Sequence, residues 1–97
     1  EQGPELTIAG GVITATQNYH QVDVESGSTD DLETINGGTV GQILIIRPQD
    51  DNRTIVAIDN TGNLRLAGNF SMEQLEDTLT LIYTGSTWLE LARSNNT

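Results

Sequence analysis

The sequence predicts an all-β fold, a small β-sandwich or barrel-like domain, and three features of the chain lead to this class. Apolar residues alternate with polar ones in short stretches, which is the period of a strand with one buried face. Apolar runs are only a few residues long, and Gly, Thr and Asn are frequent, which favours strands joined by tight turns. The 97 residues fit one domain, with a flexible lead-in at 1–5 and a polar tail at 94–97.

Three strands are expected in the first part of the chain. A short strand at residues 6–9 ends at the glycine pair that follows it, and a second strand covers residues 12–17. Over residues 20–25, His and Val alternate with polar side chains. This alternation predicts a strand with one buried face, and it places His20 on that face.

The middle of the chain combines polar loops with two strongly apolar runs. Residues 26–31 are expected to form an acidic loop, and residues 36–38 (Asn-Gly-Gly) a tight turn, because these residue types tolerate positive φ. The runs 43–46 and 55–58 are apolar at consecutive positions, which is typical of strands covered on both faces. These two strands should therefore form the centre of the domain.

Two hairpins are predicted in the second half of the chain. A polar turn that contains a glycine predicts a hairpin with a bulge between residues 53 and 67. Ser71 and Gln74 have the spacing of a capping box, but acidic residues follow so soon that one turn of helix is the most we expect. Alternation over 79–83 and 88–91 predicts a terminal hairpin. No internal repeat of fixed period is visible.

The charge of the chain excludes several classes of partner. There are 14 acidic residues and 4 basic ones, all of them arginine, and the net charge is −10. This charge repels phosphate, so neither nucleic acid nor an anionic membrane surface is an expected partner. The chain has no cysteine, no apolar stretch near the roughly 20 residues of a membrane span, and no signal-peptide pattern. Glu1 in place of methionine indicates a chain that was processed or cut from a longer one.

No combination of residues in the sequence supports catalysis, so the chain is not expected to be an enzyme. His20 is the only histidine, and the nearby acids lie on the opposite face of its strand. A place at the core edge or in a subunit contact is therefore favoured for it. Acid pairs occur at 30–31, 50–51 and 76–77, but adjacent carboxylates point apart on an extended chain, unlike a glycosidase pair. We expect these acids in solvated loops.

Residues 59–63 superficially match the start of a calcium loop, because oxygen ligands occupy alternate positions. The twelfth position of such a loop needs a bidentate Glu and is Phe70 here, so ordinary turn chemistry is favoured. No metal and no other cofactor is therefore expected. Trp88 is a candidate for an exposed receptor-binding ring, but a partly buried position or a subunit contact is favoured.

The apolar runs supply the residues expected in the core or in subunit contacts. The two central strands would pack together, and the terminal hairpin would close them. These residues are Ile43, Leu44, Ile45, Ile46, Ile55, Val56, Ile58, Leu79, Leu81, Trp88 and Leu91. Each arginine is expected to pair with carboxylates, and Arg47, Arg53 and Arg65, in or beside the central strands, would offset acidic repulsion between subunits.

Three blocks of the sequence resemble a recurrent domain of bacteriophage structural proteins. The blocks are residues 30–38 with 41–45, residues 53–56 with 61–68, and residues 77–83 with 88–91. Modules of this kind occur in tail fibres, head fibres and capsid-decoration proteins of tailed phages, commonly as β-rich trimers. The resemblance therefore implies a location in the virion and a homotrimer.

The expected function is that of a virion structural protein, either a capsid-decoration or a fibre module, that forms a homotrimer. A second reason for association is physical, because only 35% of residues are hydrophobic and no disulfide supports a thin core. The expected partners are further copies of the chain and other virion proteins, such as the major capsid protein or a fibre shaft. The alternative is a receptor-binding fibre tip whose loops at 26–31 or 60–63 recognise a host surface glycan.

Overall fold

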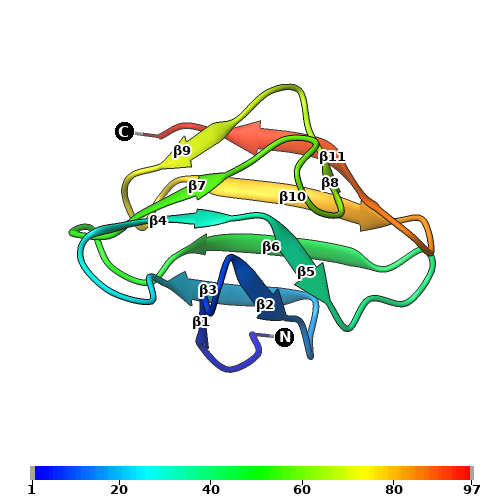
Figure 1. Cartoon of the computed structure of the whole chain (residues 1–97), viewed down its shortest axis with the longest axis horizontal. Helices are drawn as coiled ribbons and strands as arrows, with labels where there is room; N and C mark the ends of the chain where they lie inside the picture. Colours follow the sequence, from blue (N-terminus) through cyan, green and yellow to red (C-terminus); the bar gives the residue numbers. More distant parts are fainter. Residues whose placement is uncertain (1, 97) are drawn as a thin grey trace.

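The computed structural model describes residues 2–96, which form eleven strands and no helix (Figure 1). The prediction of an all-β fold is therefore confirmed. At most one helical turn was expected at residues 71–74, but this segment contains the end of a strand, and a turn follows at residues 75–76. In residues 2–96 no helix could cross a membrane.

The largest sheet contains six strands in the spatial order β1-β3-β6-β10-β11-β8. Strands β1, β3 and β6 pair in parallel, as do β11 and β8, whereas β10 is antiparallel to both β6 and β11. The bounds of these strands are β1 Leu6–Thr7, β3 Tyr19–Asp23, β6 Ile43–Pro48, β10 Thr78–Tyr83, β11 Trp88–Ser94 and β8 Leu64–Arg65.

Two smaller sheets complete the fold. One has two parallel strands and the other has three, in the order β4-β7-β9, with β4 and β7 parallel and β9 antiparallel to β7. The bounds of these strands are β2 Val12–Thr14, β5 Thr34–Asn36, β4 Thr29–Leu32, β7 Thr54–Ala57 and β9 Phe70–Met72.

Successive turns of the chain stack on one another in the manner of a β-solenoid, which corrects the expected sandwich or barrel. The chain runs from β3 to β4, and the next turn follows the same course from β6 to β7, so that His20 pairs with Ile46 and Leu32 with Ala57. A small sandwich or barrel would instead be built mainly from antiparallel neighbours joined by hairpins. Here parallel pairs between distant segments hold the turns together.

Antiparallel strands close the C-terminal end of the stack. β9 runs against β7 and β10 runs against β6, so the chain reverses direction after its last parallel turn. β11 then follows as the second strand of the predicted terminal hairpin, which is confirmed. In Figure 1 the strands β3, β6, β10 and β11 of the largest sheet follow one another from the bottom of the view to the top.

The hairpin predicted between residues 53 and 67 does not form. β7 pairs with β4 and β9, and β8 lies beside β11, so the two segments belong to different sheets. The glycine that motivated the prediction has another use, because a Cβ on Gly62 would overlap the carbonyl oxygen of Glu33 in the preceding turn of the chain. Gly62 therefore permits close stacking of two turns.

Apolar side chains from all three sheets fill the inside of the coil. The largest fully buried side chains are Trp88, Ile8, Leu32, Ile35, Leu44, Ile46, Ile55, Leu64, Met72, Leu79, Leu81 and His20. Six of the positions expected from the sequence are in this set, all of them on alternate residues of β6, β7, β10 and β11.

The two apolar runs are covered on one face only within the chain, so the expectation of coverage on both faces was wrong for the single chain. Burial alternates along each run, because side chains of a strand point to opposite faces in turn. Ile43 is 38% exposed, and Ile45, Val56 and Ile58 are half-buried. The two strands also lie in different sheets and do not pair with each other.

Leu91 was expected in the core or in a subunit contact, and the structure shows that it does not lie in the core of the single chain. A bulge interrupts the pairing of β10 with β11, and Leu81 pairs with Glu90 while Thr80 pairs with Ala92. Leu91 is therefore an extra residue between two ladder pairs, and it is 55% exposed. The bulge shifts the alternation of inward and outward side chains along β11.

Candidate functional site

The outward face of the six-stranded sheet carries a row of aliphatic side chains. Ile82 on β10 lies directly opposite Ile43 on β6 and Leu89 on β11. We call these three residues the apolar ladder. Ile43 is 38% exposed and Leu89 is 41% exposed, and Ile82 between them is half-buried.

The apolar area continues on either side of this ladder. The next row of the same face places Ile45 between Tyr19 on β3 and Thr80 on β10. Leu91, the unpaired residue at the bulge of β11, is a further exposed aliphatic side chain. Val40, 71% exposed, lies in the loop that leads into β6. The large exposed aliphatic residues of the described chain are thus carried by β6, β11 and this loop.

The same face is poor in acidic residues. The sequence places no Asp or Glu at its outward positions on β6, β10 or β8, and Glu90 on β11 pairs with Leu81 and so lies on the inward side. Asp23, at the end of β3, forms an ion pair with Arg53, and the distance from Arg53 Nε to Asp23 Oδ1 is 3.1 Å. In a chain with 14 acidic residues, a face with so little negative charge is a distinct electrostatic surface.

Arg47 and Arg65 lie on this face without a carboxylate partner among residues 2–96, although every arginine was expected to have one. The guanidinium carbon of Arg47 is 5.9 Å from the centre of the Tyr19 ring, and its buried Nε donates no hydrogen bond to the described residues. Arg65 is opposite Leu89 and donates from Nη1 to the carbonyl oxygens of Gly62 and Leu64, each at 2.9 Å.

The outward face of the three-stranded sheet has a different character. Its central row consists of Asp31 on β4, Val56 on β7 and Ser71 on β9, which pair across the sheet. The next row pairs Thr29 with Thr54. This face is therefore polar and acidic where the face of the largest sheet is apolar.

His20 is a fully buried structural residue, so the structure places it in the core and not at its edge. Its Nε2 accepts hydrogen bonds from the backbone N–H groups of Thr16 and Gln17, both at 3.0 Å. Its Nδ1 lies 2.7 Å from the carbonyl oxygen of Pro4 and so carries the proton that this contact requires. Both ring nitrogens are occupied, and the ring ties the lead-in and the β2–β3 loop to β3.

Replacement of His20 by Leu should lower the free energy of unfolding by about 1–3 kcal/mol, because the backbone N–H groups of Thr16 and Gln17 lose their acceptor at a partly buried site. Urea denaturation measures the change. The matched control is Gln21→Leu, at the next, half-buried position of β3, which should change stability far less. An equal loss in both variants would contradict a specific role for the imidazole.

Carboxylates of the acid pairs accept hydrogen bonds from backbone N–H groups. Asp77 is fully buried, which corrects its expected place in a solvated loop. Its Oδ2 accepts from the N–H of Glu73 at 2.9 Å, and its Oδ1 accepts from the N–H of Asn96 at 2.7 Å. Asp51 accepts from the N–H of Leu75 in the same way. These carboxylates fix turns at the end of the coil.

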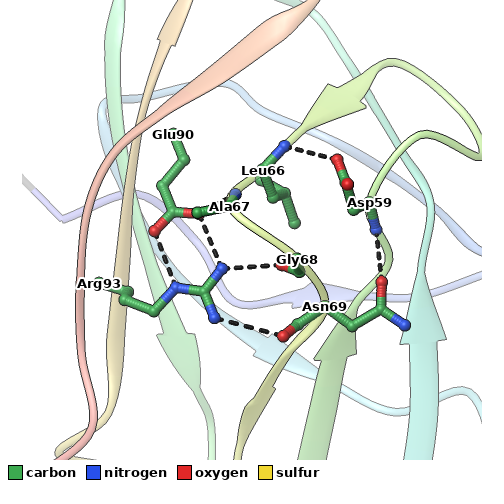
Figure 2. Close-up of polar contacts among 7 residues, drawn as sticks. All are labelled: Asp59, Leu66, Ala67, Gly68, Asn69, Glu90 and Arg93. Atoms are coloured by element: carbon green, nitrogen blue, oxygen red, sulfur yellow. Dashed lines mark hydrogen bonds and ion pairs between the residues drawn. The ribbon is translucent and has the colours of Figure 1, made fainter.

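A polar cluster beside β11 joins the terminal strand to the loop at 66–69, as Figure 2 shows. Arg93 donates from Nε and Nη2 to the two carboxylate oxygens of Glu90, both at 2.8 Å. Its Nη2 and Nη1 also donate to the carbonyl oxygens of Gly68 and Asn69. We call Glu90 and Arg93 the arginine clamp. The sequence predicted only that Arg93 pairs with some carboxylate, and it did not identify Glu90 as the partner.

The ion pair of the arginine clamp shifts the pKa values of both of its residues. Glu90 also accepts the N–H of Ala67 at 2.9 Å, and its side chain is only 10% exposed. The hydrogen bonds from Arg93 hold the pKa of Glu90 below its usual 4.5, and Glu90 in turn raises the pKa of Arg93. The guanidinium lies 4.7 Å from the centre of the Phe70 ring, which adds a cation–π contact.

The segment that superficially matches a calcium loop makes turn contacts (Figure 2). Asp59 accepts the N–H of Leu66 at 2.7 Å, and Asn69 accepts the N–H of Asp59 at 2.8 Å. In residues 2–96 no three His, Asp or Glu side chains lie close enough together to hold a metal ion. The described chain also encloses no pocket.

Trp88 lies in the core and is not an exposed receptor-binding ring. It is fully buried, deeper than the partly buried position favoured from the sequence. Its Nε1 donates to the carbonyl oxygen of Ile35 at 3.1 Å, and its ring centre is 4.8 Å from that of Tyr83. The indole therefore links the terminal hairpin to β5 in the middle of the chain.

Comparison with known proteins does not assign a family. The chain matches no model of a known protein family, and a search of curated proteins finds no relative. The outward face of the largest sheet is therefore the feature of the structure that bears on function.

Proposed function

We propose that the chain is a structural module of a bacteriophage particle, a capsid-decoration or fibre component that assembles as a homotrimer. The observation that carries the structural role is the apolar ladder, Ile43, Ile82 and Leu89, on the outside of a coil whose inside is already filled. The resemblance of residues 30–91 supports the phage context and the trimer.

The exposed apolar area gives association a physical reason. Burial of apolar surface stabilises by roughly 25 cal/mol per Å², so covering three or four large aliphatic side chains contributes several kcal/mol. A chain of 97 residues without cysteine has few other sources of stability. Contiguous apolar surface on a small protein is typical of a site for protein association.

The proposal predicts that the chain is oligomeric at micromolar concentration and that its melting temperature falls on dilution, because association stabilises the folded state. Sedimentation velocity and light scattering across a dilution series measure both. The mass expected for the homotrimer is three times the 10.5 kDa of the chain. A folded monomer with a melting temperature independent of concentration would contradict the homotrimer.

A separate assay distinguishes the two virion roles. A decoration protein should bind phage capsids that lack it and raise their resistance to heat, whereas a fibre tip should bind host cells or their surface glycans. The structure gives the glycan alternative less support. The side-chain amide of Asn63, in one of the candidate loops, both donates to and accepts from the backbone of Ile35, at 2.7 and 2.9 Å.

A further inference from the structure

We infer that the outward face of the largest sheet is the surface on which a second copy of this chain packs. The apolar ladder lies at the centre of the contact, and Arg47 and Arg65 face carboxylates of the neighbouring copy. This inference rests on the proposed homotrimer and adds to it which face each subunit uses.

Charge selects this face over the rest of the surface. Two copies with a net charge of −10 each repel one another, and the repulsion is largest where acids face acids. The outward positions of β6, β10 and β8 hold no acid, so two copies can approach there with the least repulsion. On the polar face of the three-stranded sheet, Asp31 in the central row would repel the acids of a second copy.

The arginines supply the attractive part of the contact. Among residues 2–96, Arg53 and Arg93 form ion pairs with carboxylates of their own chain, and Arg47 and Arg65 do not. Arg47 lies on the outward side of β6 next to Ile45, and Arg65 is opposite Leu89. Arg65 therefore borders the apolar ladder, and Arg47 lies near the end of β6, one row beyond Ile45. Both arginines lie at the edges of the face, where the acids that surround the face of a second copy can supply the carboxylates that they lack.

The size of the face sets the expected strength of the contact. With strands about 4.8 Å apart and residues about 3.3 Å along each strand, four central strands of six residues present roughly 19 × 20 Å. This is about half of the ~800 Å² per partner that stable interfaces bury. The contact should therefore extend beyond these four strands, to Arg65 on β8 and the loops around the face, and it should weaken measurably when one central side chain is changed.

The test compares one added carboxylate on each of two faces. Leu89→Glu places a charge in the apolar ladder, and Ser71→Glu places the same charge at an exposed outward position of β9. We expect Leu89→Glu to weaken self-association by about tenfold or more, the equivalent of one lost leucine contact, while Ser71→Glu stays close to wild type. Sedimentation equilibrium measures the association, and circular dichroism checks the fold of each variant.

Cross-linking gives a second readout that does not depend on a disruptive change. Because the chain has no cysteine, Leu89→Cys and Ser71→Cys each introduce a single thiol. Oxidation or a short bismaleimide should join copies through Cys at 89 and not through Cys at 71.

The outcomes separate this inference from the proposed function. An oligomeric wild type that is unaffected by Leu89→Glu and does not cross-link at position 89 would overturn the choice of face and leave the homotrimer standing. Equal weakening by Leu89→Glu and Ser71→Glu would also overturn the choice, since it would show a general charge effect. A monomeric wild type would overturn the homotrimer itself and the inference with it.

Discussion

Replacement of Trp88 with Ala should lower the free energy of unfolding by about 3–5 kcal/mol, the largest effect expected of any single change considered for this chain. The indole is fully buried, so its loss removes apolar burial and leaves a cavity. The carbonyl oxygen of Ile35 loses its donor at the same time, and Tyr83 loses its ring contact. Equilibrium unfolding in urea, followed by circular dichroism, measures the change.

Trp88→Phe separates the two contributions, because it keeps much of the ring and removes the N–H group. We expect it to destabilise the chain clearly less than Trp88→Ala. All three proteins should be compared at a concentration where they share the same oligomeric state. A Trp88→Ala variant within about 1 kcal/mol of wild type would show that the indole does not anchor the core.

The strands that could be predicted are those with several alternating side chains. His20 and Val22, followed by Val24, make the inward face of β3 evident, and the terminal hairpin has alternation on both of its strands. In contrast, no strand was predicted at β4 and β5, which overlap the predicted loop at 26–31 and the predicted turn at 36–38. Each contributes one fully buried aliphatic residue, Leu32 or Ile35, which is too little for a period.

The solenoid-like stacking could not be predicted because its spacing is irregular. The same stack pairs Val12 with Thr34 in one place and His20 with Ile46 in another, so no fixed period repeats along the chain. Parallel pairing between distant segments also has no local turn signal, unlike a hairpin. The all-β class follows from local pattern, whereas the architecture depends on contacts between turns.

The outward face shows where local pattern is ambiguous. Four consecutive apolar residues in β6 indicated cover on both faces, but the single chain covers only Leu44 and Ile46. On β11 the bulge moves Leu91 out of the alternation. No residue type in this strand predicts a bulge. The exposed side of these two strands is the surface for which we propose a second copy of the chain.

Replacement of Arg93 with Ala should lower the free energy of unfolding by about 2–4 kcal/mol at neutral pH. The change leaves the largely buried carboxylate of Glu90 without its cation and the carbonyl oxygens of Gly68 and Asn69 without donors. Urea denaturation at pH 7 measures the loss. Exchange of the backbone amides at 66–69 should also become faster, because the loop loses its tie to β11.

The pH dependence follows from the sign of the Glu90 shift. The pKa of Glu90 is lower in the folded chain than its ordinary 4.5, so its charge stabilises the fold above that value. This contribution is lost as the pH falls through the lowered pKa. The stability gap between wild type and Glu90→Gln should therefore be widest near neutral pH and should shrink below about pH 4.

Glu73→Gln is the matched control, because Glu73 is exposed and lies outside both ion pairs of the described chain. It should show no comparable gap at any pH. If the free energy of unfolding of Glu90→Gln is below that of wild type by the same amount from pH 7 to pH 3, the charge of Glu90 contributes nothing. The loss would then come from the poorer hydrogen-bond geometry of the amide. A deficit that closes in acid, with Arg93→Ala losing more than Glu90→Gln at pH 7, would show that the ion pair and the carbonyl contacts of Arg93 hold the loop together.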